Sequence, residues 1–182
     1  MHLKTLAFAA LAAVAIADEH THNTLREIKE ATSNFHEKLA SWDGGYMGAV
    51  PVVMHSRGLI NKLGTAMSPS SRAKAARSVS SPELEKETIE MARSLAADIG
   101  QTVDTAIAMR PKMEAIPYAG KRVGGMIFRG LHGASADLGR EFAPRASEEY
   151  REEVEAIIRA IDEHFQRGLE AFNGEQVVQS ED

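Results

Sequence analysis

Cysteine is absent from all 182 residues of this sequence. Its absence excludes disulfide bonds, thiolate metal ligands and cysteine nucleophiles, so the folded state must be stabilised by packing. Other catalytic signatures are also missing. No Gly-x-Ser-x-Gly elbow occurs, and His36-Glu37 begins a zinc-protease string in which the second histidine position is Ala40. We therefore expect a protein without enzymatic activity and without a cofactor.

Basic charge and long apolar runs are scarce as well. Acidic residues outnumber basic ones by 26 to 21, so the formal net charge is −5. A chain of this charge is a poor partner for nucleic acid or for an anionic membrane surface, because both attract basic faces. After residue 17 no apolar stretch approaches the roughly 18 residues that a membrane span requires. We expect no nucleic-acid partner and no membrane span.

The first 17 residues have the pattern of a secretory signal peptide. Lys4 supplies the basic start, an apolar run too short to span a bilayer follows, and Ala15 and Ala17 precede the expected cut. The sequence therefore predicts a secreted protein. Its expected parts are a signal peptide (1–17), one folded domain (18–174) and a disordered acidic tail (175–182).

Apolar residues recur at steps of three and four, the spacing that places them on one face of a helix. Stop signals separate these stretches: Asp43-Gly44-Gly45, a Ser-rich loop over 68–81, Pro111 and Pro144. We expect an all-α antiparallel bundle of four to five helices. The expected helices begin at a Thr24 capping box, at about residue 50 with Pro51 in the first turn, after the Ser81 cap, at Lys121 and near Glu148.

The order of these features resembles one protein family. The first helix ends in Trp42-Asp43-Gly44-Gly45, and a Ser/Pro loop precedes a long helix. That long helix is expected to break at Ala108-Met109-Arg110-Pro111-Lys112-Met113, and the last two helices are joined by Phe142-Ala143-Pro144. This layout is similar to that of the fungal hydrophobic surface-binding protein A family, also called cell-wall galactomannoproteins. The resemblance implies a non-enzymatic fungal protein, secreted or loosely associated with the cell wall, whose bundle binds fatty acids or hydrophobic surfaces. Wall-anchored relatives carry a Ser/Thr-rich stalk that this sequence lacks, so we expect free secretion.

The fourth long helix is rich in glycine, although glycine costs about 1 kcal/mol relative to alanine inside a helix. Gly130 and Ala134 fall on its inward stripe, where a bundle usually has leucine or isoleucine. Two explanations are open: close approach of a neighbouring helix, with Phe35 or Phe165 filling the space, or a cavity for an acyl chain. Flexible methionines suit such a lining. The residues expected to line a cavity are Phe35, Met91, Leu95, Met126, Ile127, Gly130, Ala134, Ile161 and Phe165.

A bound carboxylate would need a basic neighbour. Arg110, Lys112, Lys121 and Arg122 cluster near one helix junction and are the head-group candidates, although a solvated surface would hold the same residues. The apolar run from Met47 to Met54 also has two interpretations. It is either a buried helix start or an exposed patch that adsorbs to wax, lipid or plastic.

A cut after Ala17 would leave Asp18, Glu19 and His20 at the new N-terminus. An α-amine, two backbone amides and a third-position imidazole can enclose Cu(II) in a square plane. Such triplets also arise by chance in flexible termini. The three residues are therefore a candidate copper site and no more.

Two functions remain open from the sequence. The first is a secreted, non-enzymatic protein that binds a fatty acid or another amphiphile, or a hydrophobic surface, through the apolar interior of its bundle. The second is an effector-type interaction module with a fully packed core, whose partner is a host protein or a secreted protein. A cavity inside the bundle would favour the first function, and a fully packed core would favour the second.

Overall fold

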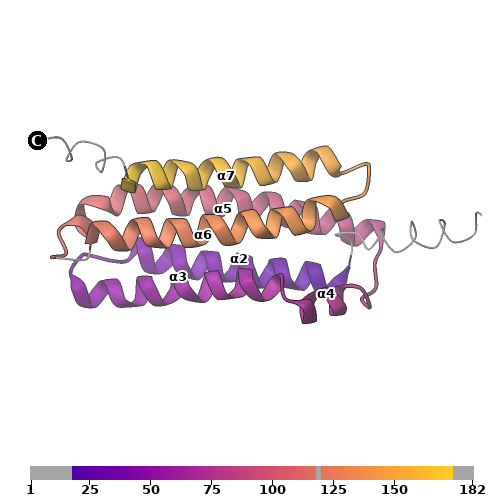
Figure 1. Ribbon diagram of the computed structural model, residues 1–182, viewed down its shortest axis with the longest axis horizontal. Coiled ribbons are helices and arrows are strands. Elements are labelled where there is room, and N and C mark those ends of the chain that lie inside the picture. Colours follow the sequence, from indigo (N-terminus) through magenta and orange to yellow (C-terminus); the bar gives the residue numbers. More distant parts are fainter. Residues whose placement is uncertain (1–17, 118–119, 174–182) are drawn as a thin grey trace, which may run out of the picture.

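The computed structural model describes residues 18–117 and 120–173, which are mostly helical. In these ranges five long helices run along the molecule (Figure 1): α2 (Glu19–Ala40), α3 (Tyr46–Ala66), α5 (Pro82–Glu114), α6 (Gly120–Phe142) and α7 (Arg151–Asn173). A short helix, α4 (Pro69–Ala75), and a 3₁₀ turn, η1 (Ala143–Arg145), lie in the connections. The expected all-α bundle is confirmed. The predicted signal peptide (1–17) and acidic tail (175–182) lie outside the described residues.

Most helix ends follow signals that are visible in the sequence. The Ser81 side chain accepts a hydrogen bond from Leu84 N at 3.1 Å, and Pro82 opens α5. Gly44 and Gly45, after α2, adopt φ angles of 112° and 82°, a backbone region that glycine enters without steric cost. The two helix-interior prolines behave differently from our expectation, because α3 begins before Pro51 and α5 continues past Pro111. Packing along these helices outweighs the roughly 3 kcal/mol that an interior proline costs.

The start of α2 also differs from the expected capping box at Thr24. The structure places the N-cap at Asp18, a fully buried residue whose carboxylate accepts from Thr21 N at 2.8 Å and from Thr21 Oγ1 at 2.6 Å. This cap satisfies two donors, so the helix begins six residues earlier than Thr24-Leu25-Arg26-Glu27 indicates.

Asp18→Ala is expected to lower the free energy of unfolding by about 1–2 kcal/mol, because both donors lose their acceptor. Urea unfolding followed by circular dichroism measures the change. The matched control is Glu19→Ala, an exposed residue of the same helical turn, which should cost only a few tenths of a kcal/mol. Equal effects of the two substitutions would contradict the assigned cap.

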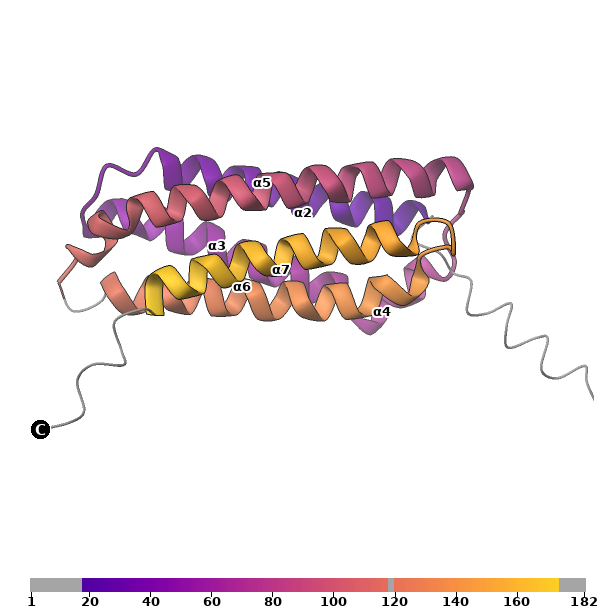
Figure 2. The same ribbon diagram turned by 90° about the horizontal axis from the view of Figure 1, so that it is seen from above.

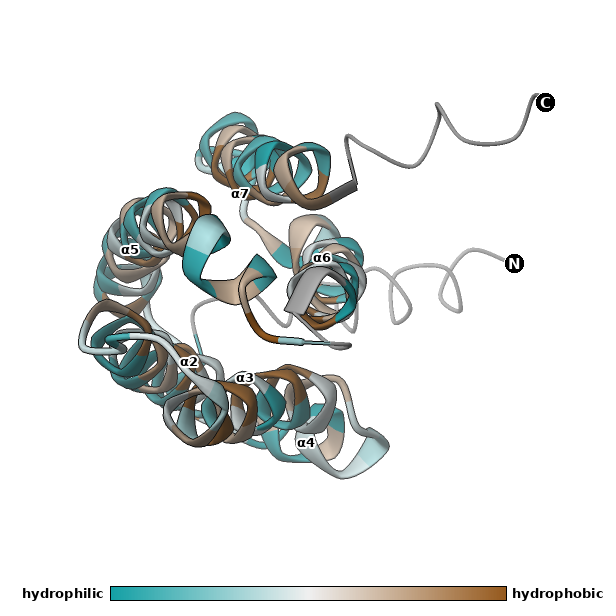
Figure 3. Cartoon of the chain, turned by 90° about the vertical axis from the view of Figure 1, so that its left-hand side faces the viewer, coloured by the Kyte–Doolittle hydropathy of each residue, from teal (hydrophilic) through white to brown (hydrophobic). Residues whose placement is uncertain are grey.

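The five long helices of the described chain form a ring in the order α2, α5, α7, α6, α3 (Figure 3). Each packs against its two neighbours in that ring, while α4 lies outside it against α2 and α3. A ring of five helices spaced about 9 Å apart holds each axis about 8 Å from the centre. Subtracting a helix radius of about 5 Å, side chains included, leaves a central gap of about 3 Å radius. The number of helices alone therefore favours a hollow interior.

Two clusters of buried apolar side chains lie within the ring. The larger includes Ile28, Phe35 and Val103, and the smaller includes Ile89 and Val154 near the starts of α5 and α7. Ala92 and Ile161 pack against both clusters, so they mark the level at which the two clusters meet. Among the described residues, no helix combines the length and the hydrophobicity needed to cross a membrane.

Candidate functional site

A cavity of about 520 Å³ lies inside the ring, at the junction of the two apolar clusters. All five long helices contribute apolar side chains to its wall: Leu25, Ile28, Leu59, Leu63, Ile89, Ala92, Leu95, Ile99, Leu131, Leu138, Phe142, Val154, Ile157, Ile158, Ile161 and Phe165. Small-molecule sites in proteins typically have volumes of about 300–1,000 Å³ and mostly apolar walls. The interior therefore has the size and the lining of a site for an apolar guest.

The polar residues of the wall are distributed unevenly. On the α2 side Thr32 uses its hydroxyl within its own helix, donating to Ile28 O at 2.9 Å. The charged lining residues, Arg140, Glu155, Arg159 and Asp162, all belong to α6 and α7, as does His132. Because Arg140, Glu155 and Arg159 line the cavity and are exposed to solvent, we infer that the cavity opens between α6 and α7. We call this opening the α6–α7 mouth.

Helices α6 and α7 lie side by side (Figure 2), and glycines set how closely they approach. A Cβ atom on Gly168 would lie 2.4 Å from the Phe128 ring, and one on Gly124 would lie 2.5 Å from the Phe172 ring. A Cβ atom on Gly139 would lie 3.0 Å from Ile158.

Between these contacts, at the mouth, His132 Nε2 lies 2.6 Å from Asp162 Oδ1. This contact links α6 to α7 at the α6–α7 mouth, because His132 belongs to α6 and Asp162 to α7.

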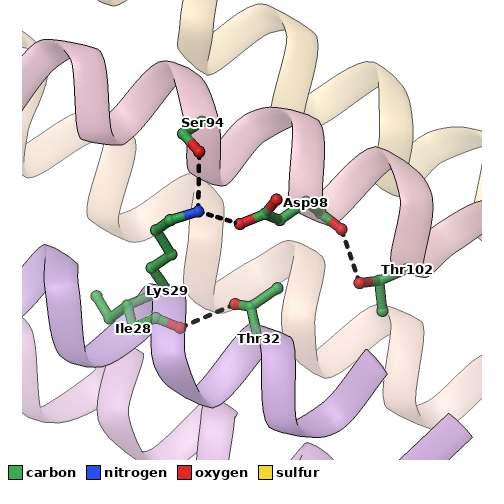
Figure 4. A network of polar contacts seen from close by, with 6 residues as sticks. All are labelled: Ile28, Lys29, Thr32, Ser94, Asp98 and Thr102. Atoms are coloured by element: carbon green, nitrogen blue, oxygen red, sulfur yellow. Dashed lines mark hydrogen bonds and ion pairs between the residues drawn. The ribbon is translucent and has the colours of Figure 1, made fainter. Parts of the chain in front are cut away.

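The wall between α2 and α5 is closed by polar contacts (Figure 4). Lys29 of α2 donates to Ser94 Oγ of α5 at 2.8 Å and forms an ion pair with Asp98 of α5. Within α5, Thr102 donates to Asp98 O at 2.7 Å. A second, polar groove of about 470 Å³ runs over these residues. Its lining includes four charged side chains, Arg26, Lys29, Glu30 and Asp98. This side of the ring therefore presents charge, and the apolar cavity opens elsewhere.

Three of the nine residues expected to line the interior do line the cavity, namely Leu95, Ile161 and Phe165. Phe35, Ile127 and Ala134 belong to the larger apolar cluster without reaching the cavity wall. Met91 lines the polar groove between α2 and α5. Met126 is 54% exposed and lies on the outer surface, which corrects its expected place in the interior.

Gly130 is also placed differently from its expected position on the cavity wall. A Cβ atom there would lie 2.9 Å from Ile60 Cδ1 of α3, so this glycine permits the close approach of two helices. Of the two explanations open from the sequence, close approach is the one that applies at Gly130. The residue that fills the space is Ile60, where we expected Phe35 or Phe165. The cavity lies farther along the bundle.

The three head-group candidates whose side chains are described, Arg110, Lys112 and Arg122, do not line the cavity. Arg110 forms an ion pair with Glu114 at 2.6 Å, Lys112 donates to Trp42 O at 3.5 Å, and Arg122 is exposed. The side chain of Lys121 lies outside the described part of the structure. These residues flank the α5–α6 junction, whereas the cavity touches α6 only from Leu131 onward.

The basic residues at the mouth, Arg140 and Arg159, were not identified from the sequence. Helical periodicity shows which residues share one face of a helix. It does not show which other helix that face meets, and the mouth is made by two helices together.

The three residues of the candidate copper site, Asp18, Glu19 and His20, form the ordered start of α2. Glu19 N donates to Val79 O and His20 N donates to Ser78 Oγ, each at 3.0 Å, and His20 Nε2 lies 2.8 Å from Ser71 Oγ. A square-planar copper complex would need these same amides and this imidazole, so it would have to break the start of α2. Among the described residues, no group of three or more histidine and acidic side chains could hold a metal ion.

No family model matches the sequence, and no curated protein matches it. Solved structures do match its fold. Ligand binding domain 2 of the Penicillium marneffei MP1 protein, in complex with arachidonic acids, has a TM-score of 0.71 at 15% identity and covers 85% of this chain and 93% of its own. The Aspergillus protein AFMP4P, in complex with palmitic acid, has a TM-score of 0.73 at 16% identity, with coverage of 83% and 96%.

Ligand binding domain 1 of the MP1 protein, complexed with arachidonic acids, gives a TM-score of 0.63 at 14% identity, with coverage of 85% and 97%. At these identities the comparisons establish a shared helical fold. The chain accounts for nearly the full length of each of these domains.

Proposed function

We propose that this protein binds a fatty acid or a similar amphiphile, with the acyl chain inside the five-helix ring. The observation that carries the proposal is the apolar cavity of about 520 Å³, to which every long helix of the described chain contributes. The proposal is supported by the complexes in which similar folds were solved, since those complexes contain arachidonic and palmitic acid. We further propose a secreted, non-enzymatic role, supported by the signal-peptide pattern of residues 1–17 and by the lack of catalytic signatures.

Most of the affinity is expected to come from the acyl chain. Each methylene removed from water contributes about 0.8 kcal/mol, so ten buried methylenes contribute roughly 8 kcal/mol before the costs of binding. A carboxylate at the mouth would meet Arg140 and Arg159, but both are exposed and each has an acidic neighbour, Asp137 and Glu155 respectively. Exposed ion pairs contribute only about 0.2–1 kcal/mol. We therefore propose selection by chain length more than by head group.

The test is to look for a bound lipid and for its displacement. Native mass spectrometry of protein secreted from a fungal host should show a mass increment equal to one or more fatty acids, and the stripped protein should bind a fluorescent fatty acid that palmitate displaces. Absence of both signals would remove the lipid-binding function. The alternative, an interaction module with a fully packed core, is disfavoured by the cavity but would then remain.

A further inference from the structure

Charge is separated between the two sides of this bundle. Helices α3, α4 and α6 together contain eight basic and two acidic residues, whereas α2, α5 and α7 contain ten basic and seventeen acidic residues. From residue 44 to residue 82 the chain contains no acidic residue. Helices α3 and α6 are neighbours in the ring, with α4 beside α3 (Figure 3). We call the outer surface of these three helices the α3–α6 face.

The same face carries exposed apolar side chains. On α3, Tyr46, Met47, Val50 and Met54 are 66%, 79%, 42% and 67% exposed, and on α6 Met126 is 54% exposed. The apolar run from Met47 to Met54 therefore combines the two interpretations that the sequence left open. Met47, Val50 and Met54 form an exposed patch, whereas Val52 is buried and Ala49 and Val53 pack against the core.

Met126 of α6 lies level with the end of the exposed patch on α3. Gly130 lies against Ile60, and α3 and α6 run in the same direction, so Met126 lies about one turn before that contact, near the end of the patch on α3. Arg122 and Arg129, one turn before and one turn after Met126, are exposed, as is Arg57 one turn after Met54. Basic and apolar groups therefore share one surface.

We propose that the α3–α6 face docks on the surface of an anionic lipid bilayer. Two independent attractions act there. Exposed methionine and tyrosine side chains can enter the interfacial region, and basic side chains are attracted by the negative surface potential of anionic lipids. Since no described helix can span a membrane, such docking would be peripheral. The net charge of −5, from which we expected no anionic membrane partner, averages over both sides of the bundle and does not describe this face.

Neighbouring carboxylates neutralise part of the basic face. Lys62 pairs with Glu27 at 3.0 Å, and this ammonium group lowers the pKa of the Glu27 carboxyl. Arg72 pairs with Glu141 at 3.3 Å. Arg57 of α3 and Lys74 of α4 are exposed basic residues of this face and are suitable positions for a test.

The experiment is vesicle flotation with residues 18–182, the chain without its predicted signal peptide. Vesicles of phosphatidylcholine alone are compared with vesicles containing roughly one-third phosphatidylserine, at about 0.15 M salt. The protein should float with the anionic vesicles only. Arg57→Glu combined with Lys74→Glu should lower the partition coefficient by about tenfold or more. Lys86→Glu combined with Arg151→Glu, the same charge change at exposed positions of α5 and α7, should leave it within about twofold.

A second variant tests the apolar part. Met47→Ser combined with Met54→Ser should reduce binding to the anionic vesicles by about tenfold, since both side chains are largely exposed and contribute little to the core. Binding of a fluorescent fatty acid should stay unchanged in all of these variants, because none of these residues lines the cavity.

Three results would overturn the proposal. They are equal or absent binding to the two kinds of vesicle, an equal loss in the control charge variant, and a dimer in sedimentation analysis that the methionine substitutions dissociate while vesicles remain unbound. The last result would assign the patch to contacts between two copies of the chain. Because fatty-acid binding is measured separately, failure of membrane docking leaves the proposed function in place.

Discussion

Substitution of Ala92 by tryptophan is expected to weaken palmitate binding by about a hundredfold while leaving the protein folded. Ala92 is a small residue on the α5 wall of the cavity, at the level where the two apolar clusters meet. An indole ring there would occupy space that about four methylenes of the ligand would otherwise fill. At about 0.8 kcal/mol per methylene, the loss is about 3 kcal/mol, or roughly a hundredfold in the dissociation constant.

The matched control for this substitution is Ala97→Trp. Ala97 belongs to the same helix but is exposed and does not line the cavity, so palmitate binding should change by less than about twofold. Displacement of a fluorescent fatty acid measures both variants, and fatty acids of ten to sixteen carbons extend the comparison. Short chains should be affected least by Ala92→Trp, because they can fit in the remaining volume. A loss of folding in Ala92→Trp, or an equal loss of binding in both variants, would contradict a cavity at this position.

Phe128→Ala is expected to cost about 3–5 kcal/mol of unfolding free energy, the largest stability effect that we predict. The Phe128 ring is 5% exposed, lies over Gly168 of α7 and stacks on Phe172 with 5.3 Å between ring centroids. Truncation would leave a gap bounded on one side by a glycine, which has no side chain to fill it. A domain of this size is typically stable by about 5–15 kcal/mol, so thermal or urea unfolding should show the loss clearly.

Combining Phe128→Ala with Gly168→Ala gives a double-mutant cycle that tests the packing of Phe128 against Gly168. In the parent protein Gly168→Ala should destabilise, because the added Cβ atom would lie 2.4 Å from the Phe128 ring. In the Phe128→Ala background the same change should stabilise, since the space is then empty and alanine is favoured over glycine in a helix by about 1 kcal/mol. Gly133→Ala, where nothing lies within 4 Å of the new atom, should stabilise in both backgrounds. An effect of one sign at Gly168 in both backgrounds would refute the assigned packing.

The helices could be predicted largely because their signals are local. The Ser81 cap, the glycines after α2 and the apolar spacing of α7 each act within a few residues, and the structure has helices at these places. The errors arose where a tertiary contact competes with a local signal. Asp18 caps α2 in place of Thr24 because it is fully buried and satisfies two donors there.

The candidate site was only partly predictable. Leu95, Ile161 and Phe165 were assigned to the interior from their helical stripes, and they line the cavity. Met126 and Gly130 were assigned in the same way and lie elsewhere, the first on the outer surface and the second against Ile60. A stripe tells which residues of one helix point the same way. Whether they meet a void, another helix or solvent depends on the partner, which periodicity does not contain.

The amino-acid sequence by itself determined an all-helical chain with no cysteine, the approximate extent of its helices and the apolar character of their inner faces. These properties follow from spacing, capping and side-chain chemistry over short distances. The tertiary structure decided the order of the five helices in the ring, and with it the cavity, its mouth between α6 and α7 and the separation of basic from acidic surfaces. That order depends on long-range packing, because a helix with one apolar stripe can bury it against several different neighbours.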